Sequence, residues 1–243
     1  MKIIKINATE STNLYLKSHS KSTNDKGITA VQTLCQTQGR GQMGTSWQAE
    51  DNKNLITSYL LPNIDLEPKD NFKMSILVSL ALKKCLESLE VPDIKIKWPN
   101  DILSCQKKIA GILIENTFIG QKISSSIIGI GLNLNQKSFD NLPQASSLSL
   151  ICQKEFDIDE VFQRLNAEIE VLYKKLIQKD FEGSLYEYYN SLYGYQEEQI
   201  FEFKNGQQKK GMITSIKNNG FLNVKFNDNT SQSFDLKEIK QVY

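Results

Sequence analysis

The chain has 243 residues, 40% hydrophobic and 23% charged, and its 29 Lys and Arg against 28 Asp and Glu leave a formal net charge of +1. This length can bury one large core with a small appended module, and the balanced charge argues against a nucleic-acid coat or a membrane-surface protein. No apolar run reaches the roughly 20 residues of a membrane-spanning helix, and the first residues are too short and too alternating for a signal peptide, so a cytoplasmic protein is expected.

Cysteine and histidine usage excludes several kinds of site. The four cysteines lie far apart in the sequence and form no C-x-x-C pair, so reduced thiols are expected in place of a zinc site or a disulfide framework. The single histidine, His19, lies in a polar stretch without a matched acid or nucleophile. Histidine triads and histidine-bound metal centres are therefore not expected.

The amino-terminal part of the chain predicts strands around one helix. Residues 1–7 alternate as a short strand, and residues 11–13 (Ser-Thr-Asn) offer capping side chains for a helix that follows. Residues 28–36 and 54–61 are rich in β-formers and predict two further strands.

A glycine-rich loop, Gly39-Arg40-Gly41-Gln42-Met43-Gly44, lies between these two strands. Glycines let backbone N–H groups approach an anion closely, and Arg40 adds a guanidinium suited to phosphate or carboxylate. The spacing reads G-x-G-x-x-G, but a dinucleotide-binding loop must open a helix, and here a polar loop and a strand follow. Taken alone, the loop is equally consistent with a surface turn.

The middle of the chain predicts one helix and three strands. Apolar residues at a three-to-four spacing indicate a helix over 68–89, and strands are predicted over 94–98, 108–117 and 122–132. Helices and strands are mixed without strict alternation, so the fold class is α+β.

Cationic residues gather at the ends of two of these strands. Lys97-Trp98-Pro99-Asn100-Asp101 presents a cation, an amide and a carboxylate around a proline turn, and Lys108 and Gly111 open the next strand. Each cluster alone is explained by solvated strand-end charges and a common turn. Together with the glycine loop they predict a site for an anionic ligand.

The carboxy-terminal part of the chain predicts two helices followed by short β-strands. A helix is predicted after Asp157, with apolar residues on one face, and a second over 181–192. Beyond Gly194, short alternating segments are separated by hairpin turn signals at 205–206, 218–220 and 227–229. The predicted domains are therefore residues 1–193 and a β-module of about five strands over residues 194–243.

Five motifs taken together resemble those of biotin–protein ligases. In chain order they are Glu10–Asn13, Gln36 with Gly39–Gly44 and Trp47, Lys97–Asp101, Lys108 to Glu115, and Gly129–Asn135, with Ala145–Leu148 as a further match. The resemblance extends over essentially the whole chain. It implies a mixed β-sheet packed by helices, the class II aminoacyl-tRNA-synthetase-like biotin/lipoate ligase fold, followed by a small SH3-like β-barrel.

The implied reaction has two steps, in which biotin and MgATP first form biotinyl-5′-AMP and the acyl group then passes to a lysine of a carrier domain. The catalytic residues implied are Lys97, Lys108 and Arg40. The residues implied to bind biotin are Ser11, Thr12, Asn13, Gln36, Arg40, Gly41, Gln42, Lys108 and Gly111. Those implied to bind ATP or the adenylate are Arg40, Trp47, Lys108, Asn133 and Asn135, and the candidates for positioning Mg²⁺ are Asn100 and Asp101.

The resemblance also implies partners. ATP and biotin would be substrates with Mg²⁺ as cofactor, and the acceptor would be the biotin carboxyl carrier domain of acetyl-CoA carboxylase or a related carboxylase. No DNA-binding helix-turn-helix precedes the first motif, so DNA binding is not expected, and pairing into a homodimer through a sheet edge is left open. Many relatives carry basic residues at the positions of Gln42 and Thr45, so Arg40 is expected to be the one cation of this loop.

The sequence is also compatible with two alternative functions. A lipoate–protein ligase shares the implied fold and the adenylate chemistry, although the glycine loop with Trp47 and the Lys97–Asp101 motif match the biotin branch better. A non-catalytic biotin- or nucleotide-binding module is the other alternative. Arg40, Lys97 and Lys108 together argue against it, because ligand binding alone would not require that set of cations.

Overall fold

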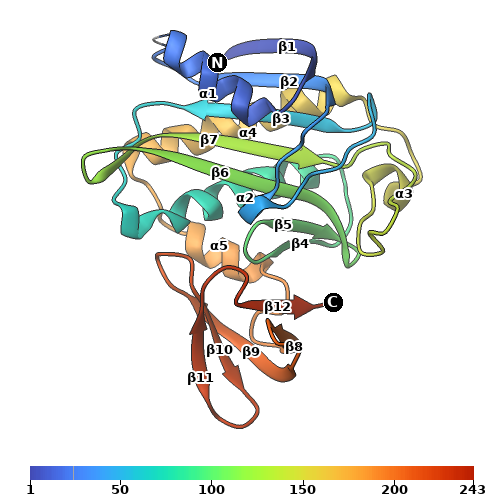
Figure 1. The fold of residues 1–243 in the computed structure, drawn as a ribbon, viewed down its shortest axis with the longest axis vertical. Helices are drawn as coiled ribbons and strands as arrows, with labels where there is room; N and C mark the ends of the chain where they lie inside the picture. Colours follow the sequence, from blue (N-terminus) through green and yellow to red (C-terminus); the bar gives the residue numbers. More distant parts are fainter. Residues whose placement is uncertain (24) are drawn as a thin grey trace.

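A computed structural model describes residues 1–23 and 25–243, and a seven-stranded mixed sheet forms the frame of its larger domain (Figure 1). The spatial order is β1-β2-β3-β7-β6-β5-β4, in which β1 and β2 are parallel and the other described neighbours are antiparallel. The strands are β1 (Lys2–Thr9), β2 (Thr29–Gln36), β3 (Leu55–Leu61), β4 (Ile94–Lys97), β5 (Asp101–Ser104), β6 (Lys107–Ile119) and β7 (Lys122–Leu132).

Helices cover both faces of this sheet. The α-helices are α1 (Thr12–Ser22), α2 (Phe72–Ser88), α3 (Leu148–Cys152), α4 (Ile158–Gln178) and α5 (Ser184–Ser191), with 3₁₀ turns η1 (Gln42–Gly44) and η2 (Pro68–Asp70). Strand β3 is buried along its whole length, because alternate side chains enter two different cores. Tyr59 and Leu61 pack in the large core with α2 and α4, whereas Leu60 packs with Leu16 of α1.

The ends of two helices show how local sequence sets their limits. Helix α4 begins where the Asp157 carboxylate accepts a hydrogen bond of 2.9 Å from the Glu160 N–H. Helix α1 differs from the expectation, because Ser11 occupies the N-cap position but its side chain makes no capping bond. The Thr12 N–H instead donates to Gln36 Oε1 at 2.9 Å, so a side chain from β2 caps this helix.

The carboxy-terminal module is a five-stranded antiparallel sheet with the order β11-β10-β9-β8-β12. Its strands are β8 (Glu198–Phe203), β9 (Gln208–Ile216), β10 (Leu222–Phe226), β11 (Ser231–Phe234) and β12 (Ile239–Val242). The three predicted hairpin turns separate β8, β9, β10 and β11, and β12 brings the module to the predicted number of about five strands. In the described residues no pairing joins the edge strands β11 and β12, so closure into a barrel stays a prediction.

The module packs directly against the larger domain at the end that carries β4, β5 and α5 (Figure 1). The Trp98 indole N–H donates to the Gly220 carbonyl oxygen at 2.9 Å, and the two groups are buried. Phe201 and Val224 of the module belong to the same hydrophobic cluster as the core under the large sheet. The division at residue 193 therefore marks a change of architecture between two units that share one core, and it stays a prediction.

Three details differ from the sequence expectations or lie outside them. The turn around Pro99 leads into the short strand β5, and α3 follows Ser147; neither element was predicted. His19 does have an acidic partner, since its Nε2 lies 2.8 Å from Asp25 Oδ2. Over residues 1–23 and 25–243, no helix combines the length and the apolar character needed to cross a membrane.

Candidate active site

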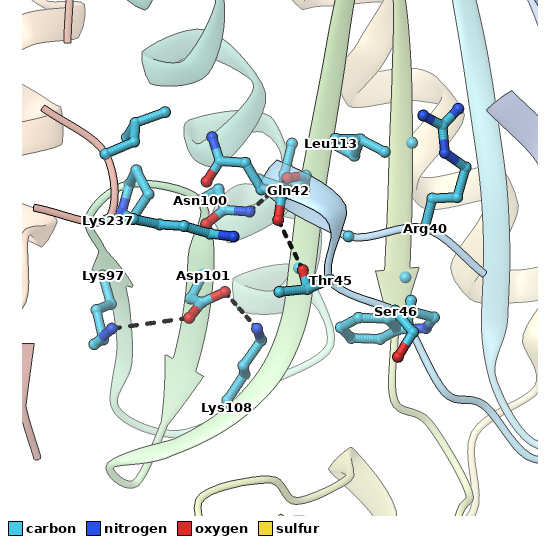
Figure 2. Close-up of a pocket in the computed structure, with 18 of the residues that line it drawn as sticks. Arg40, Gln42, Thr45, Ser46, Lys97, Asn100, Asp101, Lys108, Leu113 and Lys237 are labelled. Carbon is cyan, nitrogen blue, oxygen red and sulfur yellow. Dashed lines mark hydrogen bonds and ion pairs between the residues drawn. The ribbon is translucent and has the colours of Figure 1, made fainter. Parts of the chain in front are cut away.

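A cavity of about 600 Å³ opens between the larger domain and the module, and most of the sequence-predicted site residues line it (Figure 2). The predicted residues among its lining are Ser11, Thr12, Asn13, Gln36, Arg40, Gly41, Gln42, Trp47, Lys97, Asn100, Asp101, Lys108 and Gly111. They come from segments as far apart in the chain as α1 and β6, so the fold gathers what the sequence separates.

Two lysines share one carboxylate at one side of the cavity. Strands β4 and β5 form a hairpin in which Lys97 and Asp101 are cross-strand partners, and Lys97 Nζ lies 3.9 Å from Asp101 Oδ2. Lys108 Nζ, at the start of β6, lies 2.6 Å from Asp101 Oδ1 (Figure 2). One carboxylate thus compensates two ammonium groups, and the cluster keeps a net positive charge that an anionic ligand can neutralise.

Lys97 is the more enclosed of the two lysines. The residue is 8% exposed, and the Tyr243 ring of the module lies 4.8 Å from its Nζ. Burial lowers the pKa of Lys97, the Asp101 carboxylate opposes this shift, and the ammonium groups of Lys108 and Lys240 add to it.

The backbone of Lys108 is held by the segment that follows β7. The Lys108 N–H donates to the Gln144 carbonyl at 2.7 Å, and the Ser146 N–H donates to the Lys108 carbonyl at 3.0 Å. These two bonds flank Ala145, which forms a parallel bridge with Lys108. The predicted Ala145–Leu148 motif therefore fixes the strand that carries the catalytic candidate.

The opposite end of the cavity is a buried polar network. The Ser58 hydroxyl donates to Asn13 Oδ1 at 2.6 Å and lies 2.7 Å from Thr12 Oγ1, which in turn donates to Gln36 Oε1 at 3.2 Å. Gly129 makes room for this network, because a Cβ there would come 2.4 Å from Asn13 Oδ1. The end can therefore present both donors and acceptors to a neutral polar ligand.

The glycine loop forms a tight hairpin over the cavity. The Gly41 N–H donates to the Thr45 carbonyl at 2.6 Å, and the Thr45 N–H and hydroxyl both donate to the Gln42 carbonyl. These loop amides are therefore used within the loop, so anion binding depends more on side chains than the glycine pattern suggested. Lys237 of the module donates to the Met43 carbonyl at 2.5 Å and ties the loop to the second domain.

Arg40 lies apart from the lysine pair. Its Nη1 is 3.5 Å from Glu115 Oε1, and Figure 2 shows it across the cavity from Lys97 and Lys108. Glu115 also accepts a hydrogen bond of 2.7 Å from Asn13 Nδ2. The predicted set of three cations is thus divided between the two ends of the cavity.

Trp47 lies on a platform of glycines from β6 and β7. A Cβ at Gly131 would come 2.3 Å from the Trp47 ring, and one at Gly111 would come 2.9 Å from it. Lys108 Nζ is 5.7 Å from the ring centroid. Gly111 and Gly131 therefore allow the close approach of an aromatic ring to the sheet.

Asn133 and Asn135 do not line this cavity. Asn133 Nδ2 donates to the Ser146 carbonyl at 3.0 Å, and its buried Oδ1 has no partner in the part of the chain that the structure describes. Asn135 binds both backbone groups of Phe156. Both side chains brace the loops after β7, and their contact with a nucleotide stays a prediction.

The candidates for magnesium have other partners. Asn100 Nδ2 donates to the Ile112 carbonyl at 2.8 Å, and both oxygens of Asp101 face lysines. Across the described ranges, no cluster of three or more His, Cys, Asp and Glu side chains forms a metal cage. The donor set thus does not favour a protein-built Mg²⁺ site, and an ion carried by ATP phosphates would need at most one or two protein ligands.

Several residues at the cavity were not singled out by sequence reasoning. Thr57 lines the cavity, and Ser58 donates a hydrogen bond to the lining residue Asn13; both are buried polar groups within the otherwise apolar strand β3, a pattern visible in the sequence. The lysines of the module, Lys204, Lys237 and Lys240, also line the cavity but have no motif around them. Only the packing of the module reveals them.

Known proteins are similar in sequence to a large part of this chain. A sequence model described as the Biotin/lipoate A/B protein ligase family matches residues 6–133 of the chain, which is more than half of it. The bifunctional ligase/repressor BirA of Bacillus spizizenii is 34% identical over 152 residues, covering 60% of this chain and 46% of that protein. The biotin–[acetyl-CoA-carboxylase] ligase of Mycobacterium tuberculosis is 31% identical over 165 residues, covering 67% of this chain and 60% of that protein. The chain thus matches about half the length of these curated relatives.

Solved structures share the whole architecture. The biotin protein ligase from Aquifex aeolicus in complex with biotin and ATP has a TM-score of 0.78 at 24% identity, covering 99% of this chain and 98% of that one. The enzyme from Leishmania major in complex with biotinyl-5-AMP has a TM-score of 0.66 at 21% identity. These likenesses confirm the predicted α+β fold with a second β-rich unit.

Proposed function

The chain belongs to the Biotin/lipoate A/B protein ligase family, and on that premise we propose that it is a biotin–protein ligase that forms biotinyl-5′-AMP and transfers biotin to a lysine of a carrier domain. The relatives from Bacillus and Mycobacterium are named as ligases, and the latter is named for acetyl-CoA carboxylase. The acceptor we propose is accordingly the biotin carboxyl carrier domain of such a carboxylase.

The observation that carries the proposal is the contrast between the two ends of one cavity. One end holds Lys97 and Lys108 on a shared carboxylate, and the other holds the network of Thr12, Asn13 and Ser58. A biotin molecule has the same polarity, with a neutral cyclic urea at one end and a carboxylate at the other. The dithiolane of lipoate has no N–H or C=O groups with which Thr12 or Asn13 could form hydrogen bonds, so this polar end of the cavity would gain nothing from it.

The first step joins two anions. The biotin carboxylate attacks the α-phosphorus of ATP, the bond to the β-phosphate oxygen breaks, and pyrophosphate leaves with its electron pair. In this proposal Lys108 turns from Asp101 toward the reacting carboxylate and phosphate oxygens, and Lys97 neutralises charge on the same side. Magnesium bound to the triphosphate would supply further charge compensation.

The second step transfers the acyl group. The neutral amine of the acceptor lysine attacks the acyl carbonyl of the mixed anhydride, AMP leaves, and an amide forms with loss of the ammonium proton to solvent. Lys97 would polarise the carbonyl, and Arg40 would leave Glu115 for the adenylate phosphate, since their contact of 3.5 Å is long and the Arg40 side chain is 46% exposed.

Exchange of labelled pyrophosphate into ATP tests the proposal. We expect exchange that depends on biotin and not on lipoate, followed by labelling of a carrier domain. Lys108→Ala should slow exchange by about 10²–10³-fold, because it removes a charge that acts on the transition state. Lys174→Ala, an exposed lysine on α4, is the matched control. Exchange driven by lipoate would favour the lipoate branch, and binding of biotin without exchange would favour a non-catalytic module.

A further inference from the structure

The carboxylate of Glu115 holds two lining side chains that come from different segments. Glu115 Oε2 accepts a hydrogen bond of 2.7 Å from Asn13 Nδ2, at the start of α1. Its other oxygen, Oε1, lies 3.5 Å from Arg40 Nη1 of the glycine loop. Asn13 and Arg40 line the cavity, but Glu115 does not, so any effect of Glu115 on a ligand must pass through its partners.

An asparagine amide needs an external group to fix which way it faces. Rotation about its last torsion is nearly two-fold, so oxygen and nitrogen exchange places at little intrinsic cost. Around Asn13 the two partners differ, because Glu115 Oε2 accepts from the Asn13 NH₂ group whereas the Ser58 hydroxyl donates to the Asn13 oxygen. Together they place Nδ2 toward Glu115 and Oδ1 toward Ser58.

The surroundings make this orientation costly to lose. Asn13 is only 3% exposed, and the absent side chain of Gly129 leaves just enough room for its oxygen. A flipped amide would bring its NH₂ group onto the Ser58 side and an oxygen toward Glu115, so that two acceptors would face each other. The other Glu115 oxygen lies 3.5 Å from Arg40 Nη1, so the carboxylate faces a cation on the side away from Asn13.

We propose that Glu115 is a positioning residue of the urea end of the cavity, which fixes the orientation of the Asn13 amide and thereby the recognition of biotin. This inference rests on the proposed function, since it assumes that Asn13 meets the ligand. Glu115 itself takes no part in the chemical steps. Its removal should therefore weaken biotin recognition and leave the turnover of bound biotin nearly intact.

Steady-state exchange with biotin and ATP varied separately tests this inference. Glu115→Ala should raise the KM for biotin by about tenfold or more, because the buried Asn13 amide loses its charged acceptor, and should change kcat by less than about threefold. Glu115→Gln keeps an oxygen that can accept from Asn13, so its KM for biotin should stay within about threefold of the unmutated protein. Glu182→Ala, an exposed glutamate before α5, is the matched control.

A double-mutant cycle with Asn13→Ala separates positioning from general stability. If Glu115 acts through Asn13, adding Glu115→Ala to Asn13→Ala should change the KM for biotin by less than about twofold. Effects that multiply in the double variant, or a KM for Glu115→Ala within about twofold of the unmutated protein, would overturn the inference. Failure of the unmutated protein to show biotin-dependent exchange would instead overturn the proposed function, so the two failures are distinguishable.

Discussion

At the scale of single residues, charge pairing within the cavity decides what each cation can do. Sequence reasoning grouped Arg40, Lys97 and Lys108 as one set, and the structure divides them between Glu115 and Asp101. The sequence identifies the residue types that an anionic ligand needs. It does not identify the carboxylates that hold them, because pairing depends on which strand ends come within about 4 Å.

Arg40 offers a direct test at this scale. Arg40→Gly removes the loop's cation, so we expect the variant to release biotinyl-AMP and to label lysines of bystander proteins. Biotin incorporated into an unrelated protein, added together with ATP, measures this release. Because Gln42 and Thr45 are uncharged, no neighbour in the loop replaces Arg40. Bystander labelling no greater than that of the unmutated protein would contradict the expectation.

At the scale of elements, the long strands and helices follow from the sequence and the short ones do not. The helix predicted after Asp157 is observed as α4. Asp157 is its N-cap, and its regularly spaced apolar residues are buried. Strand β5 has four residues and α3 has five, too few for a period to emerge. Ser11 makes no side-chain capping bond, and Gln36 of β2 accepts from the Thr12 N–H at this helix end instead.

The glycines of β6 and β7 provide a prediction at the element scale. Gly131→Ala would place a Cβ 2.3 Å from the Trp47 ring, so the ring must move. We expect a loss of about 1–3 kcal/mol in packing or ligand binding, and a red shift of tryptophan emission as Trp47 meets water. Gly27→Ala, where a Cβ would meet nothing within 4 Å, is the control. Unchanged emission together with an unchanged KM would show that the platform is not needed.

At the scale of the whole molecule, the module completes the cavity that the larger domain begins. Lys237 reaches the glycine loop, Tyr243 covers Lys97, and Trp98 of the larger domain is bound to Gly220. A β-module recognised from its hairpin turns alone carries no sign of these contacts. The contribution of the module to the cavity follows only from its packing against the larger domain.

The position of Tyr243 over Lys97 leads to a prediction about the pH dependence of activity. Burial lowers the pKa of Lys97 from its usual 10.5, so the charged form is lost at a lower pH than for a solvated lysine. Tyr243→Ala should rehydrate the ammonium and raise its pKa, and the alkaline limb of the kcat/KM profile should move to higher pH. Tyr186→Ala, which is 73% exposed in the unmutated protein, should leave the limb in place. A limb that stays fixed or moves to lower pH in Tyr243→Ala would contradict this account.

The sequence by itself determined the α+β class, the long elements, the five-stranded module and a set of site residues, most of which line the cavity. It could do so because periodicity, turn chemistry and residue type are local properties. Only the tertiary structure decided that Lys97 and Lys108 share Asp101, that Arg40 and Asn13 meet at Glu115, and that Asn133 and Asn135 brace loops away from the cavity. Those outcomes depend on distances between segments remote in sequence, which are set by the packing of sheet, helices and module.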